Sequence, residues 1–126
     1  MKKFFFFWGF LFLPFFAVAQ VTTDPEVVTE SGTVRVIFDA AKGNKGLQGY
    51  TGDVYAHTGV ITDRSVNGSD WRYAPAWGDN REKYKLTPMG NDLWQLTIAP
   101  DIRAYYGVPE TEKILKLVFV FRSGDT

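Results

Sequence analysis

Short runs of alternating apolar and polar residues, separated by turn residues, constrain the fold of this chain more than any other feature. Val34, Val36 and Phe38 recur at every second position, and Leu93–Ile98 repeats the pattern. A period of two is typical of strands that bury one face. Glycine, asparagine and proline punctuate the segments between these runs, as they do at the turns of all-β proteins. We therefore predict an all-β domain built as a β-sandwich.

The strand predicted near residues 53–60 is the most informative. Val54 and Ala56 fall on one face and Tyr55 and His57 on the other, because successive side chains of a strand point to opposite sides. Trp94 alternates in register with Leu96, so we expect it in the core.

Three further elements complete the prediction. Lys83–Thr87 has the pattern of a short strand, and Ile114–Arg122 is apolar on both faces, which indicates a central strand. Between them, Asp101 is placed to cap a single helical turn over Ile102–Tyr106, which Gly107 would end.

The N-terminus has the pattern of a secretory signal peptide over residues 1–19. Two lysines precede an apolar run, Phe4–Phe16, and Ala17-Val18-Ala19 gives the small-x-small pattern of a cleavage site. The alternative is a transmembrane anchor, but the run is shorter than the roughly 20 residues that a spanning helix needs. We expect a bacterial protein that is secreted or held in the cell envelope, with no membrane insertion after cleavage.

Charge and cysteine content narrow the partners and the source of stability. Cleavage would remove two of 14 basic residues and none of 14 acidic ones, so the formal net charge would fall from zero to −2. Such a domain gives no electrostatic reason to expect nucleic acid as a partner. The chain has no cysteine, so its core or neighbouring domains must supply the stability that disulfides give many small secreted domains.

The domain boundaries follow from these patterns. Residues 20–32 are polar and lack a clear period, and they are interpreted as a linker before a domain at 33–126. Ser123-Gly124-Asp125-Thr126 has the composition of a hairpin turn. A hairpin needs a returning strand, so we expect a domain that is C-terminally truncated, as the N-terminal piece of a longer protein or a shortened reading frame.

Catalysis within this chain is not supported by the motifs. There is one histidine, no thiol, no nucleophile-elbow serine and no phosphate-binding glycine loop. Asp63, Ser65 and Asn67 match the opening of a calcium loop, but Ala74 stands where the bidentate glutamate belongs. We predict no enzyme activity, no cofactor and no metal at this loop, and a non-helical calcium site that uses Asp70 or Asp79 remains open.

An aromatic group is the clearest functional signal. Tyr55 and His57 share a strand face, and the long irregular segment that follows holds Trp71, Tyr73 and Trp77. Flat aromatic faces bind the C–H faces of neutral sugars, and a few polar groups recognise the hydroxyls. We therefore predict a carbohydrate-binding site at these five residues, although each could instead be a core residue.

The chain resembles a known family in the order of its motifs. The relevant runs are GYTGDVYAHTGVIT, SDWRYAPAWGDN, YKLTPMGNDLWQLTIAPDIRAYYGVP and ILKLVFVFRSGD. Over Thr33–Thr126 the chain is similar to the N-terminal immunoglobulin-like domain of secreted bacterial α-amylase-type glycoside hydrolases, and in layout to starch-binding modules. The resemblance implies an early-set immunoglobulin-like sandwich and a catalytic barrel downstream. It also implies that His57, with Trp71 or Trp77, contacts an α-glucan.

The leading hypothesis is a non-catalytic, α-glucan-associated module of a secreted amylase-type enzyme. One alternative is a structural spacer that packs on a catalytic domain and binds no sugar. A second is an adhesin-like, protein-binding module, which would expose an apolar patch. Exposure of Trp71 and Trp77 on one surface with His57 would favour sugar binding, and burial of both would favour the spacer.

Overall fold

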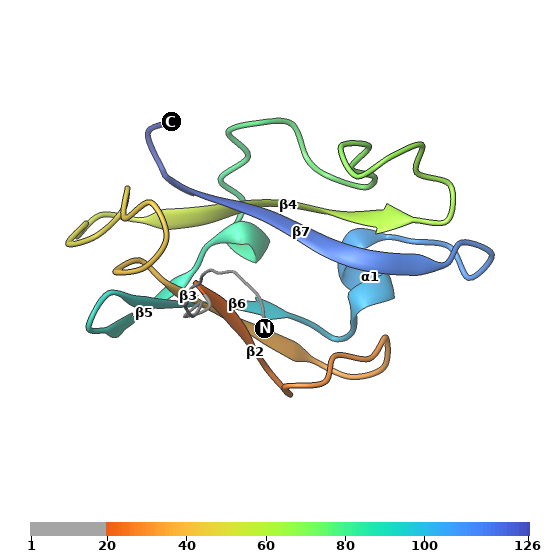
Figure 1. Cartoon of the computed structure of the whole chain (residues 1–126), viewed down its shortest axis with the longest axis horizontal. Coiled ribbons are helices and arrows are strands. Elements are labelled where there is room, and N and C mark those ends of the chain that lie inside the picture. The colour runs from red at the N-terminus through yellow and green to blue at the C-terminus, as the bar shows by residue number, and fades with distance from the viewer. Residues whose placement is uncertain (1–19) are drawn as a thin grey trace, which may run out of the picture.

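Two antiparallel β-sheets make up nearly all the regular structure (Figure 1). The computed structural model describes residues 20–126, so the predicted signal peptide lies outside the described residues. One sheet has the order β2-β3-β6-β5, and the other pairs β4 with β7. The strands are β2 (Val21–Asp24), β3 (Val34–Asp39), β4 (Val54–Thr62), β5 (Thr87–Gly90), β6 (Leu93–Ile98) and β7 (Ile114–Ser123). The all-β prediction is confirmed.

The register of β3 against β6 explains the alternating pattern. Val36 lies opposite Leu96, and Phe38 lies opposite Trp94. All four side chains are buried, because residues directly opposite in an antiparallel pair point to the same face. The prediction that Trp94 belongs to the core is confirmed.

The two sheets lie as two layers with the core between them (Figure 1). The rings of Phe38 on β3 and Phe121 on β7 stack with centroids 4.3 Å apart, joining the layers directly. Ala56 and Val60 on β4 are buried in the same cluster. Their face of β4 is therefore the inner face.

The helix α1 (Ile102–Tyr106) covers one end of the core. The Asp101 carboxylate accepts a hydrogen bond from the Ala104 amide, and Gly107 ends the helix with φ +79°, as predicted. Tyr105 and Tyr106 are both buried. The Tyr106 hydroxyl lies 2.8 Å from Oγ1 of Thr58, so the helix is tied to the centre of β4.

Two predicted boundaries were wrong. Val21–Asp24 is strand β2, paired with β3, and not part of a linker. Its four residues are too few to show a period of their own, and pairing with a neighbour defines them. The segment predicted as a strand at Lys83–Thr87 begins as a 3-10 turn, η1 (Glu82–Tyr84), and the strand starts only at Thr87.

The position of β7 also differs from the expected central strand. In residues 20–126 it pairs with β4 alone, so one edge of β7 has no strand beside it. Along β7, Leu115 and Val120 are exposed and Phe119 is half-buried. The apolar character that predicted a central strand therefore belongs here to an edge.

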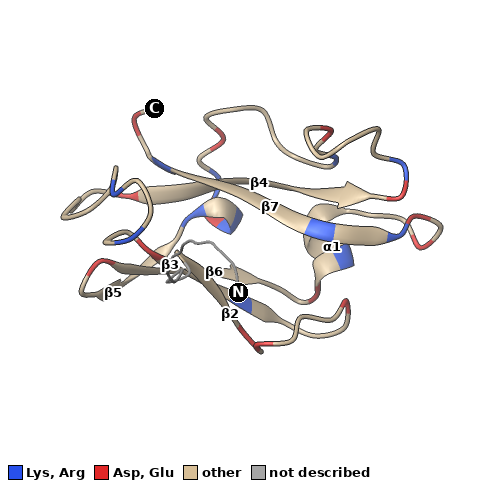
Figure 2. Cartoon of the chain, in the orientation of Figure 1, with Lys and Arg blue, Asp and Glu red and all other residues tan. Residues whose placement is uncertain are grey.

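Charged residues of both signs are spread over the loops and strand ends (Figure 2). None of the described helices is long and apolar enough to cross a membrane.

The core contacts predict a large effect of truncating β6. Leu96→Ala, at a position that is 1% exposed, should lower the free energy of unfolding by about 2–5 kcal/mol, through lost burial and the cavity left behind. Urea denaturation monitored by circular dichroism measures it. The matched control is the exposed neighbour Thr97→Ala, for which we expect a change within about 0.5 kcal/mol. Equal stability of the two variants would contradict the assigned register.

Candidate carbohydrate-binding site

Close packing against Gly59 seats the long segment after β4 on the outer face of that strand. Arg72 and Val60 exchange two backbone hydrogen bonds, of 2.8 and 3.0 Å. A Cβ at Gly59 would lie 2.9 Å from Cβ of Ala74 and 3.0 Å from the Arg72 carbonyl oxygen, so only glycine fits without a shift. The segment is thereby fixed to β4 at Arg72, the residue that follows Trp71.

His57 and two tryptophans form one aromatic cluster, called here the His57 cluster (His57, Trp71 and Trp77). The His57 ring stacks on Trp71 with centroids 5.8 Å apart and planes 23° apart. Its centroid lies 5.0 Å from that of Trp77, whose plane is tilted by 57°. Trp77 is 56% exposed and Trp71 is half-buried. Three of the five predicted residues are thus together at the surface.

Tyr55 shares the face of His57, as predicted, but it is buried and not available to a ligand. It lies opposite Arg122 of β7, and the Arg122 guanidinium covers its ring at 5.4 Å from the centroid. Strand alternation predicts the face of a side chain but not what covers it, and this predicted contact residue lies beneath the surface. Tyr55 supports the site from below.

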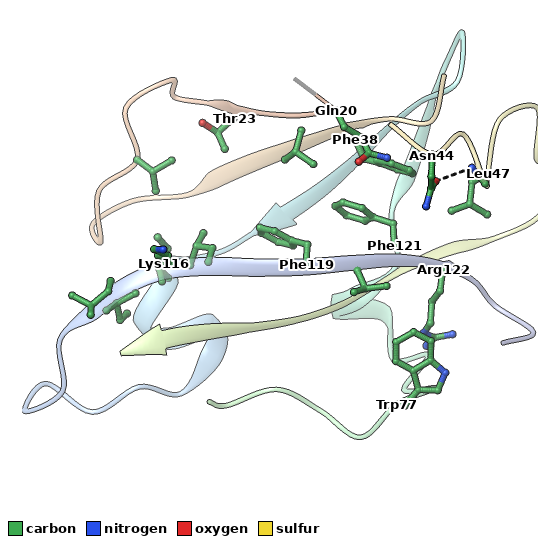
Figure 3. Close-up of a pocket in the computed structure, with 18 of the residues that line it drawn as sticks. Gln20, Thr23, Phe38, Asn44, Leu47, Trp77, Lys116, Phe119, Phe121 and Arg122 are labelled. Carbon is green, nitrogen blue, oxygen red and sulfur yellow. Dashed lines mark hydrogen bonds between the residues drawn. The ribbon is translucent and has the colours of Figure 1, made fainter. Parts of the chain in front are cut away.

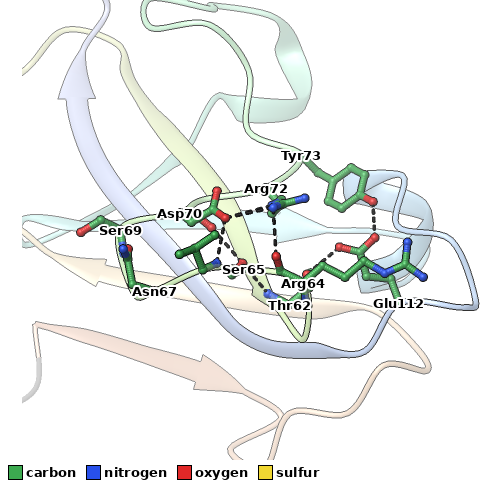
Figure 4. A network of polar contacts seen from close by, with 10 residues as sticks. Thr62, Arg64, Ser65, Asn67, Ser69, Asp70, Arg72, Tyr73 and Glu112 are labelled. Carbon is green, nitrogen blue, oxygen red and sulfur yellow. Dashed lines mark hydrogen bonds and ion pairs between the residues drawn. The ribbon is translucent and has the colours of Figure 1, made fainter.

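Tyr73 points to Glu112 in a polar network (Figure 4). Its hydroxyl donates a hydrogen bond to Oε1 of Glu112 at 2.5 Å, and Thr62 donates to Oε2 at 2.5 Å. Glu112 is only 2% exposed, and these two bonds, Thr62 first, lower the pKa of its carboxyl. Tyr73 therefore fastens the long segment to the turn before β7.

The backbone of Tyr73 carries strain that fits this fastening role. Its φ is +59°, a left-handed conformation that bulky residues rarely adopt. Such a conformation persists where surrounding contacts over-determine it. The hydroxyl bond to Glu112 and the neighbouring backbone pairing of Arg72 provide those contacts.

The candidate calcium loop is organised by its own hydrogen bonds. Asp70 accepts from the Val66 amide and from the Arg72 guanidinium, and both bonds lower the pKa of its carboxyl. Asp63 accepts from the Lys113 amide. Within residues 20–126, no three His, Cys, Asp or Glu side chains gather in a group that could hold a metal ion.

The electrostatic setting of His57 favours its neutral form. Partial burial lowers the pKa of the imidazole, and the nearby positive charge of Arg122 lowers it further. A neutral imidazole has one ring nitrogen that donates and one that accepts. At neutral pH the ring can therefore both donate to and accept from sugar hydroxyls.

A groove, called here the β7 groove, follows the free edge of β7 (Figure 3). Its volume is about 1060 Å³, and Phe38, Phe119 and Phe121 line its inner wall. Trp77 and Arg122 also line it, from the other face of β7. The groove therefore extends from the phenylalanine rings between the two sheets to Trp77 of the His57 cluster.

Two residues that shape the site, Arg122 and Glu112, were not predicted from the sequence. Arg122 directly follows the apolar run LVFVF, which is a usable signal because buried arginine is uncommon without specific partners. Glu112 lies in a polar turn between proline and lysine, and nothing in that local pattern marks it as buried.

Comparison with known proteins places no family on this chain. No protein-family model matches it, and no curated protein matches it in sequence. The function of the site therefore has to be inferred from its residues and their geometry.

The setting of His57 predicts an acid-shifted titration. His57 is the sole histidine of the chain, so its ring C–H signals in proton NMR report one midpoint, which we expect below the ordinary 6.5. The unfolded chain then binds the proton more readily, so the free energy of unfolding should fall as pH drops below about 6.5. A midpoint at or above 6.5 would contradict the described environment.

The Glu112 network predicts a coupled change at a distance from the His57 cluster. Tyr73→Phe removes one donor, so the pKa of Glu112 should rise toward its ordinary value. At pH values where Glu112 is ionised, the free energy of unfolding of the variant should be lower than that of the wild type. Carboxyl carbon-13 NMR and thermal melting measure the two effects. Tyr50→Phe is the control, because the described residues give the Tyr50 hydroxyl no hydrogen bond. Identical behaviour of the two variants would contradict the network.

Proposed function

We propose that this chain is a non-catalytic, α-glucan-associated module of a secreted bacterial amylase-type glycoside hydrolase. Its fold in this proposal is an immunoglobulin-like β-sandwich, and residues 1–19 are a cleaved signal peptide. The ligand is a neutral glucan chain, and a catalytic domain downstream in the parent protein is the natural partner. The module brings that domain to its polysaccharide and carries out no chemistry itself.

The surface placement of the His57 cluster is the observation that carries the proposal. Trp77 presents a largely exposed indole, and Trp71 stacks beside the same imidazole. Burial of both tryptophans would have favoured a spacer, and neither is buried. Two indole faces supply stacking area against sugar C–H groups, and neutral His57 supplies hydroxyl recognition.

The fixed geometry of the cluster also supports binding. Trp71 directly precedes the Arg72 backbone pair with Val60, and His57 lies within β4 itself. Aromatic side chains on a rigid support lose little conformational freedom when a ligand binds. The cluster is thus organised before a ligand arrives.

One observation favours the spacer alternative. The β7 groove is lined by half-buried apolar residues, among them Leu117 and Phe119, and borders exposed Leu115. Such a surface suits packing against another protein domain. Trp77 belongs both to the His57 cluster and to the lining of the groove, so a measurement of sugar binding is what distinguishes the two roles.

The proposal predicts retardation of the protein in native gels that contain soluble starch. Trp77→Ala and Trp71→Ala should each weaken the apparent affinity by about tenfold, because each removes one stacking face near the centre of the contact. Gel mobility across a series of starch concentrations gives the apparent dissociation constant.

The matched control is Met89→Ala on β5. Met89 is 52% exposed, a fraction similar to the 56% of Trp77, and it lies in the other sheet. The retardation of the Met89→Ala variant should therefore equal that of the wild type. Unretarded migration of the folded wild-type protein, or equal mobility of all variants in starch, would overturn the proposed function.

A further inference from the structure

Arg122 occupies an unusual position beneath the His57 cluster. It lies on β7 opposite Tyr55, on the face that carries His57, and is 4% exposed. Its guanidinium carbon lies 5.4 Å from the centroid of Tyr55 and 5.7 Å from that of Trp77. One buried cation therefore contacts the supporting ring of Tyr55 and the exposed ring of Trp77; Figure 3 shows Arg122 beside Trp77.

The hydrogen bonds of Arg122 join two turns that flank the cluster. Its Nη2 donates to the Asp79 carbonyl oxygen at 2.9 Å and to Oδ1 of Asn80. Its Nη1 donates to the carbonyl oxygens of Ser123 and Thr126, each at 3.1 Å. Asp79 is two residues after Trp77, so these bonds hold the end of the segment that carries the indole.

The charge of Arg122 is not balanced as a stabilising ion pair would be. Within residues 20–126 no Asp or Glu side chain forms an ion pair with Arg122, and the carboxylate of Asp79 pairs with Arg81. Its Nε is buried without a hydrogen-bond partner. Burying a cation with incomplete partners is costly, so the presence of arginine at this position points to a role besides stability.

We propose that Arg122 is the positioning residue of the sugar site, holding the Trp77 indole against His57 through cation–π contact and through hydrogen bonds to the Asp79 carbonyl and the Asn80 side chain. The planar guanidinium suits both tasks, because it stacks on aromatic faces while its edge donates several hydrogen bonds. A lysine at this position would keep the charge but not the fork of donors. This role rests on the proposed function for its purpose, while the contact that it maintains exists without a ligand.

The experiment compares the full chain with Arg122→Met, Arg122→Lys and the control Arg35→Met, an exposed arginine on β3 in the other sheet. Without ligand, NMR contacts between the Trp77 indole and His57 ring protons should be present in the wild type and in Arg35→Met. They should be lost in both Arg122 variants. The His57 titration midpoint should rise in Arg122→Met, which lacks the positive charge, and should stay near the wild-type value in Arg122→Lys, which keeps it. The comparison separates the effect of the charge from that of the Trp77 position.

In starch gels, we expect both Arg122 variants to bind about tenfold more weakly than Arg35→Met. If Arg122→Met does not fold, Asn80→Ala tests the same clamp, since Asn80 is exposed and bridges Arg122 to Gly124; loss of the Trp77–His57 contacts there supports the inference. Retained contacts in the folded Arg122 variant, or in Asn80→Ala in its place, would overturn it. If the wild type is not retarded by starch but its Trp77–His57 contacts still depend on Arg122, the proposed function is overturned and the positioning role of Arg122 stands.

Discussion

Apolar contact between the inner faces of the two sheets is the interaction on which everything else in this molecule depends. The chain has no cysteine, so no disulfide joins the layers. Instead, the stacked rings of Phe38 and Phe121 and the buried side chains of β4 and β6 hold the sheets together. Burial of apolar surface is the dominant favourable term in folding. The position of β4, and with it His57, is set by that contact.

The site uses the outer face of the strand whose inner face belongs to the core. Thr58, next to His57, points inward, where it bonds the Tyr106 hydroxyl and the Val118 carbonyl. The imidazole is therefore carried on backbone that the core holds on its other side. The tryptophans come from a long irregular segment, which needs separate attachments at Gly59, Glu112 and Arg122 to reach comparable order. The rigid strand and the attached loop together explain how residues that are apart in the sequence share one surface.

Elements with local signals could be predicted from the sequence, whereas their partners could not. The strand Leu93–Ile98 and the helix Ile102–Tyr106 match the predicted bounds, since alternation and capping are properties of a few adjacent residues. Strand β2 and the edge position of β7 depend on pairing with distant segments. In the site, the gathering of His57, Trp71 and Trp77 agrees with the prediction, but the burial of Tyr55 does not. What covers a side chain is decided by tertiary structure, and Arg122 covers this one.

The backbone pair between Val60 and Arg72 divides the segment after β4 into two parts with different freedom. Trp77 lies beyond the pair and Trp71 directly precedes it, so both indoles are held close to β4. Residues before the pair form a closed excursion whose tip, Asn67–Gly68, is exposed and has open space around Gly68. Loop tips of this kind accept insertions and deletions readily. The length of the excursion can therefore change without displacing the aromatic surface.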